Sequence, residues 1–164
     1  MVGIAASGRT PYVIGALQHA RSTGSFTAAV VCNPHSPVAA AAELSIEVVT
    51  GPEALTGSTR LKAGTATKMV LNMLSTGAFV RLNKVYGNLM VDVQATNEKL
   101  IARTRRIVSL AADCDLATAE QLLRACNGEV KTAILSQRLK LDPAAARARL
   151  QQHTGSVRAA LAGG

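Results

Sequence analysis

The chain has 164 residues, of which 48% are hydrophobic and 2% aromatic, and its formal net charge is +8. This length suits one domain, or a small domain with an appendage, and the lack of aromatic side chains disfavours a stacking platform for single-stranded nucleic acid. The sequence contains no run of about 18 apolar residues that could span a membrane. Its three cysteines are widely separated, which favours a reducing compartment, and we expect a cytoplasmic protein.

The chain begins with an apolar strand at residues 2–6, and a helix runs from Pro11 to about Arg21. Proline is well tolerated in the first helical turn, because its missing N–H group has no helical partner there. Open α/β sheets bind ligands at the carboxyl ends of their strands, so the loop between strand and helix is a candidate anion site. Helix capping is the simpler interpretation of its two hydroxyl residues taken alone. The loop consists of Ser7, Gly8, Arg9 and Thr10.

Two further strands follow the first helix. Residues 25–34 form a nearly continuous apolar run, which is typical of a buried strand in a parallel sheet. A third short strand is predicted around Ile46–Val49. The alternation of strands and helices predicts an α/β fold with a partial, doubly wound parallel sheet.

A long helix is predicted within residues 50–82, after a loop that contains several hydroxyl groups. Its central part, Met69–Val80, is apolar or small nearly all round, so we expect it to be buried between layers or at a subunit contact. The positive end of its dipole favours an anion. The start of this helix has more hydroxyl and cationic side chains than helix capping requires, so ligand binding is the preferred interpretation. These side chains belong to Ser58, Thr59, Arg60 and Lys62.

Glu53 lies in the same loop and has two interpretations. A carboxylate beside a phosphate site is unfavourable unless it handles a proton or binds a sugar hydroxyl group. Alternatively, Glu53 lies outside the ligand site.

The rest of the chain is predicted to be helical. A helix over 97–111 has an apolar stripe, with its arginines largely off that stripe. Asn127-Gly128 and Asp142-Pro143 mark turns between the four short helices that follow. Those helices are expected at about 117–126, 129–139, 143–152 and 156–162, and they form a small all-helical tail.

The net positive charge of the chain indicates an anionic ligand or partner. Lys and Arg exceed Asp and Glu mainly in residues 1–110, where the glycine-bearing loops lie. No known nucleic-acid-binding motif accompanies this surplus, so a nucleic-acid partner is disfavoured, and a phosphorylated small molecule fits better.

Three stretches carry a family resemblance: "GIAASGRTPYV", "VTGPEALTGSTRLKAGTATKMVLNMLSTG" and "KVYGNLMVDVQATNEKL". They resemble the N-acetylmuramic acid 6-phosphate etherases, whose relatives include the sugar isomerase (SIS) phosphosugar-binding domains. In that family the first stretch lies in the middle of the chain. The resemblance therefore implies the C-terminal part of a SIS domain over residues 1–112 and a helical lid or tail over 113–164. It also implies that the two catalytic glutamates belong to an N-terminal half.

The resemblance also implies a chemistry. The etherases release D-lactate from N-acetylmuramic acid 6-phosphate by β-elimination and water addition, and they need neither a metal nor a cofactor. On this chain, Glu53 matches an acid/base or hydroxyl-contacting position. The implied substrate-binding residues are Ser7, Gly8, Arg9, Thr10, Ser58, Thr59, Arg60 and Lys62.

Three functions remain open at this stage. One is an etherase-like lyase that is catalytic only with a complementing N-terminal half. Another is a non-catalytic phosphosugar-binding regulator similar to the glucokinase regulatory protein, and the third is a basic module that associates with nucleic acid. An unpaired strand edge and a uniformly apolar helix favour a homodimer, another oligomer or an aggregation-prone monomer.

Overall fold

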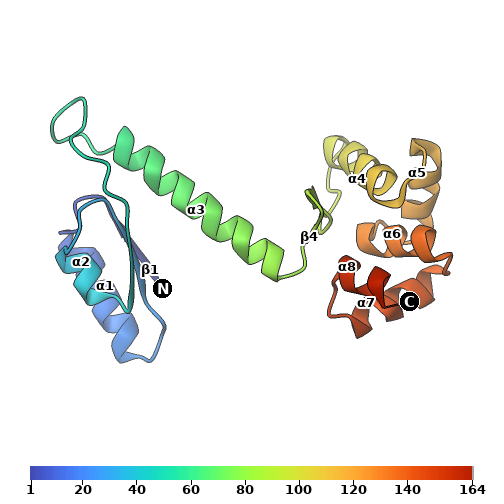
Figure 1. The fold of residues 1–164 in the computed structure, drawn as a ribbon, viewed down its shortest axis with the longest axis horizontal. Coiled ribbons are helices and arrows are strands. Elements are labelled where there is room, and N and C mark those ends of the chain that lie inside the picture. Colours follow the sequence, from blue (N-terminus) through green and yellow to red (C-terminus); the bar gives the residue numbers. More distant parts are fainter. Residues whose placement is uncertain (164) are drawn as a thin grey trace. The chain divides into compact units, whose positions relative to one another are not determined.

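Three short parallel strands form a sheet in the first part of the chain (Figure 1). The computed structural model describes residues 1–163, which divide between two units, residues 1–76 and residues 77–163. The strands pair in the order β1-β2-β3, with Val2 opposite Ala28 and Ala28 opposite Leu44. They span Val2–Ala5 (β1), Ala28–Val31 (β2) and Leu44–Glu47 (β3).

Two helices cover one face of this sheet. Leu17 of α1 (Pro11–Ser22) and Val38 of α2 (Pro37–Ala41) are fully buried, and they belong to one core cluster with Ala5, Ala29 and Val31. The register places these three strand residues on one face, because alternate residues of a strand point the same way. The α/β fold with a partial parallel sheet is thus confirmed. The third strand begins two residues before its predicted position.

Helix α3 (Lys62–Arg81) crosses the boundary between the units. Its only buried residues are Ala63 and Val70, and every residue from 71 to 82 is exposed. Burial of this helix between layers was predicted as one of two alternatives, and for the described chain it is wrong. The apolar side chains of α3 therefore need a partner other than the residues described, or they face water.

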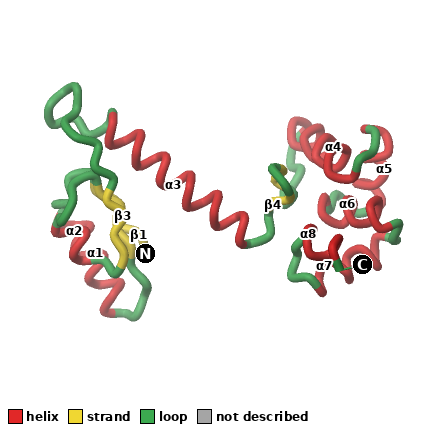
Figure 2. Tube along the Cα trace, in the orientation of Figure 1, coloured by secondary structure: helices red, strands yellow, loops and turns green. Residues whose placement is uncertain are grey.

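The second unit is mainly helical (Figure 2). A two-stranded antiparallel hairpin, β4 (Val85–Tyr86) and β5 (Leu89–Met90), precedes five helices. The last four helices agree with the predicted tail to within about a residue. The five are α4 (Glu98–Ala112), α5 (Leu116–Ala125), α6 (Val130–Leu139), α7 (Pro143–Gln152) and α8 (Val157–Ala162).

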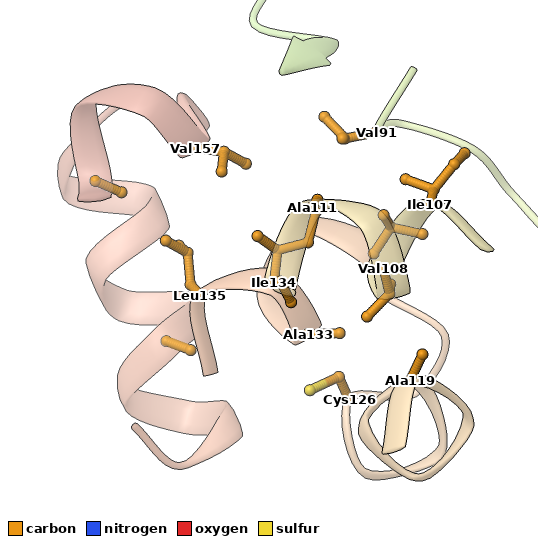
Figure 3. Packing of buried hydrophobic residues seen from close by; sticks show 14 residues of the cluster. Val91, Ile107, Val108, Ala111, Ala119, Cys126, Ala133, Ile134, Leu135 and Val157 are labelled. Atoms are coloured by element: carbon orange, nitrogen blue, oxygen red, sulfur yellow. The ribbon is translucent and has the colours of Figure 1, made fainter. Parts of the chain in front are cut away.

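Helix α6 is the centre of the second core. It packs against α4, α5, α7 and α8, and its Ile134 and Leu135 are fully buried (Figure 3). Val108 of α4 and the thiol of Cys126 belong to the same cluster. Because α4 packs against α5 and α6, residues 98–112 belong to this helical unit. The division into domains between residues 112 and 113 remains a prediction.

Candidate functional site

The loop after β1 is a tight turn that contacts the start of α2. Gly8 is buried with a φ of +67°, and a Cβ atom at this position would lie 2.2 Å from Ser36 Oγ. The Gly8 N–H group donates to the carbonyl of Ala5 (2.9 Å), and the Gly8 carbonyl accepts from the N–H group of Val38 (2.9 Å). Glycine is therefore required here both for the backbone conformation and for the close approach.

The hydroxyl groups of this loop do not cap α1. Thr10 occupies the N-cap position, yet its side chain makes no capping hydrogen bond within the described chain. The Ser7 hydroxyl oxygen accepts from the N–H group of Arg9 at 3.4 Å. The side chains of Ser7, Arg9 and Thr10 are all exposed, so they are accessible to a ligand.

Glu53 caps the N-terminus of α3. Its carboxylate accepts hydrogen bonds from the backbone N–H groups of Lys62 (2.9 Å) and Ala63 (3.0 Å). These bonds hold the pKa of Glu53 below its ordinary value, because they favour the ionised form. The bond from Ala63 has the largest effect, followed by that from Lys62. Sequence reasoning missed this contact, because Glu53 lies nine residues before Lys62 and outside the local capping patterns.

The Glu53 cap changes what α3 offers to an anion. Two of the N–H groups that lack a partner within the helix already donate to Glu53. An anion would therefore be attracted mainly by the cationic and hydroxyl side chains nearby. Arg60, Lys62 and Thr65 line a depression of about 550 Å³ at this end of the helix, together with the apolar residues Leu61, Ala66 and Met69. Thr65 was not among the predicted residues, although its position three residues after Lys62 places both on one side of a helix.

The two predicted loops lie along the same edge of the sheet. Asn33 donates through its side-chain amide to the carbonyl of Ala6 (2.9 Å), next to Ser7. Cys32, at the end of β2, has its thiol sulfur 3.9 Å from the carbonyl oxygen of Ala63. The carboxyl end of β2 therefore contacts both segments.

The depression itself contains only part of the predicted set. Among the predicted residues, only Arg60 and Lys62 line it. Ser58 is half-buried in a turn in which its N–H group donates to the carbonyl of Leu55 (3.0 Å), and Thr59 is exposed. The roles of Ser58, Thr59 and the loop after β1 in ligand binding remain predictions.

The helical unit has a second depression, which sequence reasoning did not indicate. It has a volume of about 720 Å³ and lies at the start of α6. Asp92 forms ion pairs here with Lys84 (2.9 Å) and Lys131 (3.5 Å). The hydrogen bond from Lys84 is the main reason that the pKa of Asp92 lies below its ordinary value. Glu129 also lines this depression, so its two carboxylates balance the charges of the two lysines.

Comparison with known proteins finds several relatives that share one name. No family model matches it. It is 59% identical over 164 residues to the N-acetylmuramic acid 6-phosphate etherase of Pectobacterium atrosepticum, a match that covers 100% of this chain and 54% of that protein. The proteins of the same name from Erwinia tasmaniensis and Photobacterium profundum are 57% and 54% identical, over 99% and 100% of this chain and 53% and 54% of their own lengths. The chain thus spans about half the length of these curated relatives. Over its whole length it is homologous to a part of the N-acetylmuramic acid 6-phosphate etherases.

Proposed function

We propose that this chain binds the phosphate of N-acetylmuramic acid 6-phosphate and forms part of an etherase, a carbon-oxygen lyase of peptidoglycan recycling. The names and the identity of its relatives support this substrate class. The proposed reaction releases D-lactate and leaves N-acetylglucosamine 6-phosphate. It needs proton transfers but neither a metal nor a cofactor.

The depression at the start of α3 carries the proposal. Arg60 and Lys62 both line it, and neither forms an ion pair with any of the residues from 1 to 163. Two cations and the Thr65 hydroxyl group therefore remain free to bind a phosphate through charge-assisted hydrogen bonds. The predicted contacts from Ser7, Gly8, Arg9 and Thr10 extend the site along the sheet edge.

Turnover is proposed to require a second polypeptide. Glu53 is ionised at neutral pH, which is the state that a general base needs, but both of its oxygens accept backbone hydrogen bonds. The resemblance assigns the two catalytic glutamates to an N-terminal half. A complementing half, or a homodimer, is therefore part of this proposal.

The same capping contact favours a second candidate function. A Glu53 that serves only to hold the start of α3 leaves a site that binds a phosphosugar without converting it, as in a regulatory protein. The two functions differ in one measurable product, because only the etherase releases D-lactate.

A cytoplasmic location is also proposed. The free thiols of Cys32, Cys114 and Cys126 support a reducing compartment. None of the described helices is both long and apolar enough to cross a membrane.

Calorimetric titration with N-acetylglucosamine 6-phosphate tests phosphate binding. We expect Lys62→Ala to weaken binding by about 1.5–3 kcal/mol, the scale of a hydrogen bond to a charged group. Lys68→Ala is the matched control, because Lys68 is an exposed lysine of α3 outside the depression. Binding of unphosphorylated N-acetylglucosamine should hardly change in either variant. Equal losses for both sugars, or for both lysine variants, contradict the phosphate role of Lys62.

A further inference from the structure

We infer that the depression at the start of α6 binds a free α-amino acid with an aliphatic side chain. This inference goes beyond the proposed function. Every residue that lines the depression belongs to the second unit, and none of them is among the residues proposed to bind phosphate. Its charged lining residues are Lys84, Asp92, Glu129 and Lys131.

Lys131 is the charged group of the depression with the fewest close contacts. Its side chain is only 14% exposed, and its one ion pair within residues 1–163 is the contact of 3.5 Å between Nζ and Asp92. A lysine ammonium group has three N–H donors, and lysines that are buried to this degree normally have close partners. Lys84, by contrast, lies 2.9 Å from Asp92 and also 5.5 Å from the ring centre of Phe79. The ammonium group of Lys131 can therefore accommodate a further anionic partner.

Asp92 provides the complementary charge. Its carboxylate contacts both lysines, but a carboxylate has about four acceptor positions, and this side chain is 40% exposed. The carboxylate of Glu129 is more fully occupied, because it accepts hydrogen bonds from the Thr132 hydroxyl group (2.7 Å) and from Arg147 (3.0 Å). An ammonium group of a ligand therefore has its best acceptor in Asp92, next to Lys131.

The short distance between Lys131 and Asp92 determines the class of ligand. A simple anion is repelled by two carboxylates in the depression, and a simple cation is repelled by two lysines. An α-amino acid carries its ammonium and carboxylate groups on one carbon atom, so both can reach opposite charges that lie 3.5 Å apart. The charges at the two ends of a peptide are farther from each other.

The remaining lining residues favour an aliphatic side chain on the ligand. Val93, Val130 and Leu150 line the depression, whereas none of its lining residues in the described chain is aromatic. A nucleotide base or a sugar ring therefore has no aromatic side chain to stack on. The volume of about 720 Å³ is within the range of small-molecule sites and leaves room for water around an amino acid.

Calorimetric titration of the full chain with L-leucine tests the inference. We expect leucine to bind at least about tenfold more tightly than N-acetyl-leucine, which lacks the ammonium group, or isoamylamine, which lacks the carboxylate. A hydrogen bond to a charged group contributes on this scale. Lys131→Met should weaken leucine binding by a similar factor. Lys99→Met is the matched control, because Lys99 is also the second residue of a helix but is exposed and lies outside the depression.

Two further measurements complete the test. Circular dichroism checks that both lysine variants keep their helices. Nuclear magnetic resonance locates the ligand, and we expect leucine to shift the backbone amide signals of residues 128–132, at the start of α6.

Four results overturn the inference: no binding of leucine, equal binding of either analogue, equal losses in the two lysine variants, or amide shifts confined to residues 1–76. Equal binding of N-acetyl-leucine would show a simple anion site. Titration of the unmodified chain with N-acetylglucosamine 6-phosphate separates these failures from failure of the proposed function. Phosphate binding without leucine binding refutes only the amino-acid site, and leucine binding without phosphate binding refutes only the proposed function.

Discussion

Glu53 links a loop to the start of α3, which begins nine residues further along the sequence. Its carboxylate holds the N–H groups of Lys62 and Ala63, and a glutamine has only one oxygen to offer to them. We therefore expect Glu53→Gln to speed amide hydrogen exchange at these two positions. Mass spectrometry of the exchanging chain measures this effect, and unchanged exchange contradicts the capping role.

The same variant also tests catalysis. We expect the unmodified chain alone to release no D-lactate from N-acetylmuramic acid 6-phosphate above background, because the glutamates implied to be catalytic belong to another half. Lactate release by the lone chain that Glu53→Gln abolishes would instead make Glu53 a catalytic residue.

Gly8 is the second position where a single residue determines local structure. We expect Gly8→Ala to destabilise the first unit by about 1–3 kcal/mol or more, because it combines a left-handed backbone with a collision against Ser36. Gly24→Ala is the matched control: its φ is +78°, but a new Cβ atom there meets open space. Urea unfolding of both variants isolates the collision, and equal losses of stability contradict it.

At the scale of elements, Asp92 joins the segment after β5 to α6. The lowered pKa means that ionised Asp92 favours the folded state, so its contribution is complete above the ordinary pKa of an aspartate and disappears as the pH falls through the lowered value. We expect Asp92→Asn to reduce stability at pH 7 by less than about 1 kcal/mol, since the pair is partly exposed. The difference from the unmodified chain should shrink in urea titrations as the pH falls below the ordinary pKa of an aspartate. A constant difference contradicts the ion-pair explanation.

The elements that the sequence predicts well are those with strong local signals. Asp115, Asp142 and Ser156 each cap a helix of the second unit through their side chains, and all the predicted tail helices are present. Three short elements were not predicted, the helix α2 and the strands β4 and β5 of the hairpin. Ser36 caps α2 and Pro37 is its first residue, a pattern that is typical of a helix start. Gly87-Asn88 lies between two pairs of apolar residues, a pattern that is typical of a hairpin turn.

The candidate site was less predictable, because its geometry depends on contacts that are distant in the sequence. Arg60 and Lys62 were recognised from their place at a helix start, and both line the depression. The Glu53 cap and the contact between Cys32 and Ala63 could not be predicted, since no local pattern encodes them. The exposure of Leu71–Val80 could not be predicted either, because a sequence pattern gives apolarity but not the partner that covers it.

At the scale of the whole molecule, the two units differ in the size of their cores. The cluster of buried apolar residues in the first unit has six members, and that of the second unit has 14. A larger buried core raises the free energy needed to open a region. We therefore expect the backbone amides of Ile134 and Leu135 to exchange more slowly than that of Val31. Native-state hydrogen exchange measures this order, and equal protection in both units contradicts independent stability.

Each unit carries its own chemical reporter of opening. Cys32 is buried at the sheet edge of the first unit, and Cys126 is buried in the core of the second. Burial raises the pKa of the Cys126 thiol, so it is a poor nucleophile until its surroundings open. Reaction of these two thiols with a thiol reagent, read separately from that of the half-buried Cys114, therefore times the exposure of each unit without an added label.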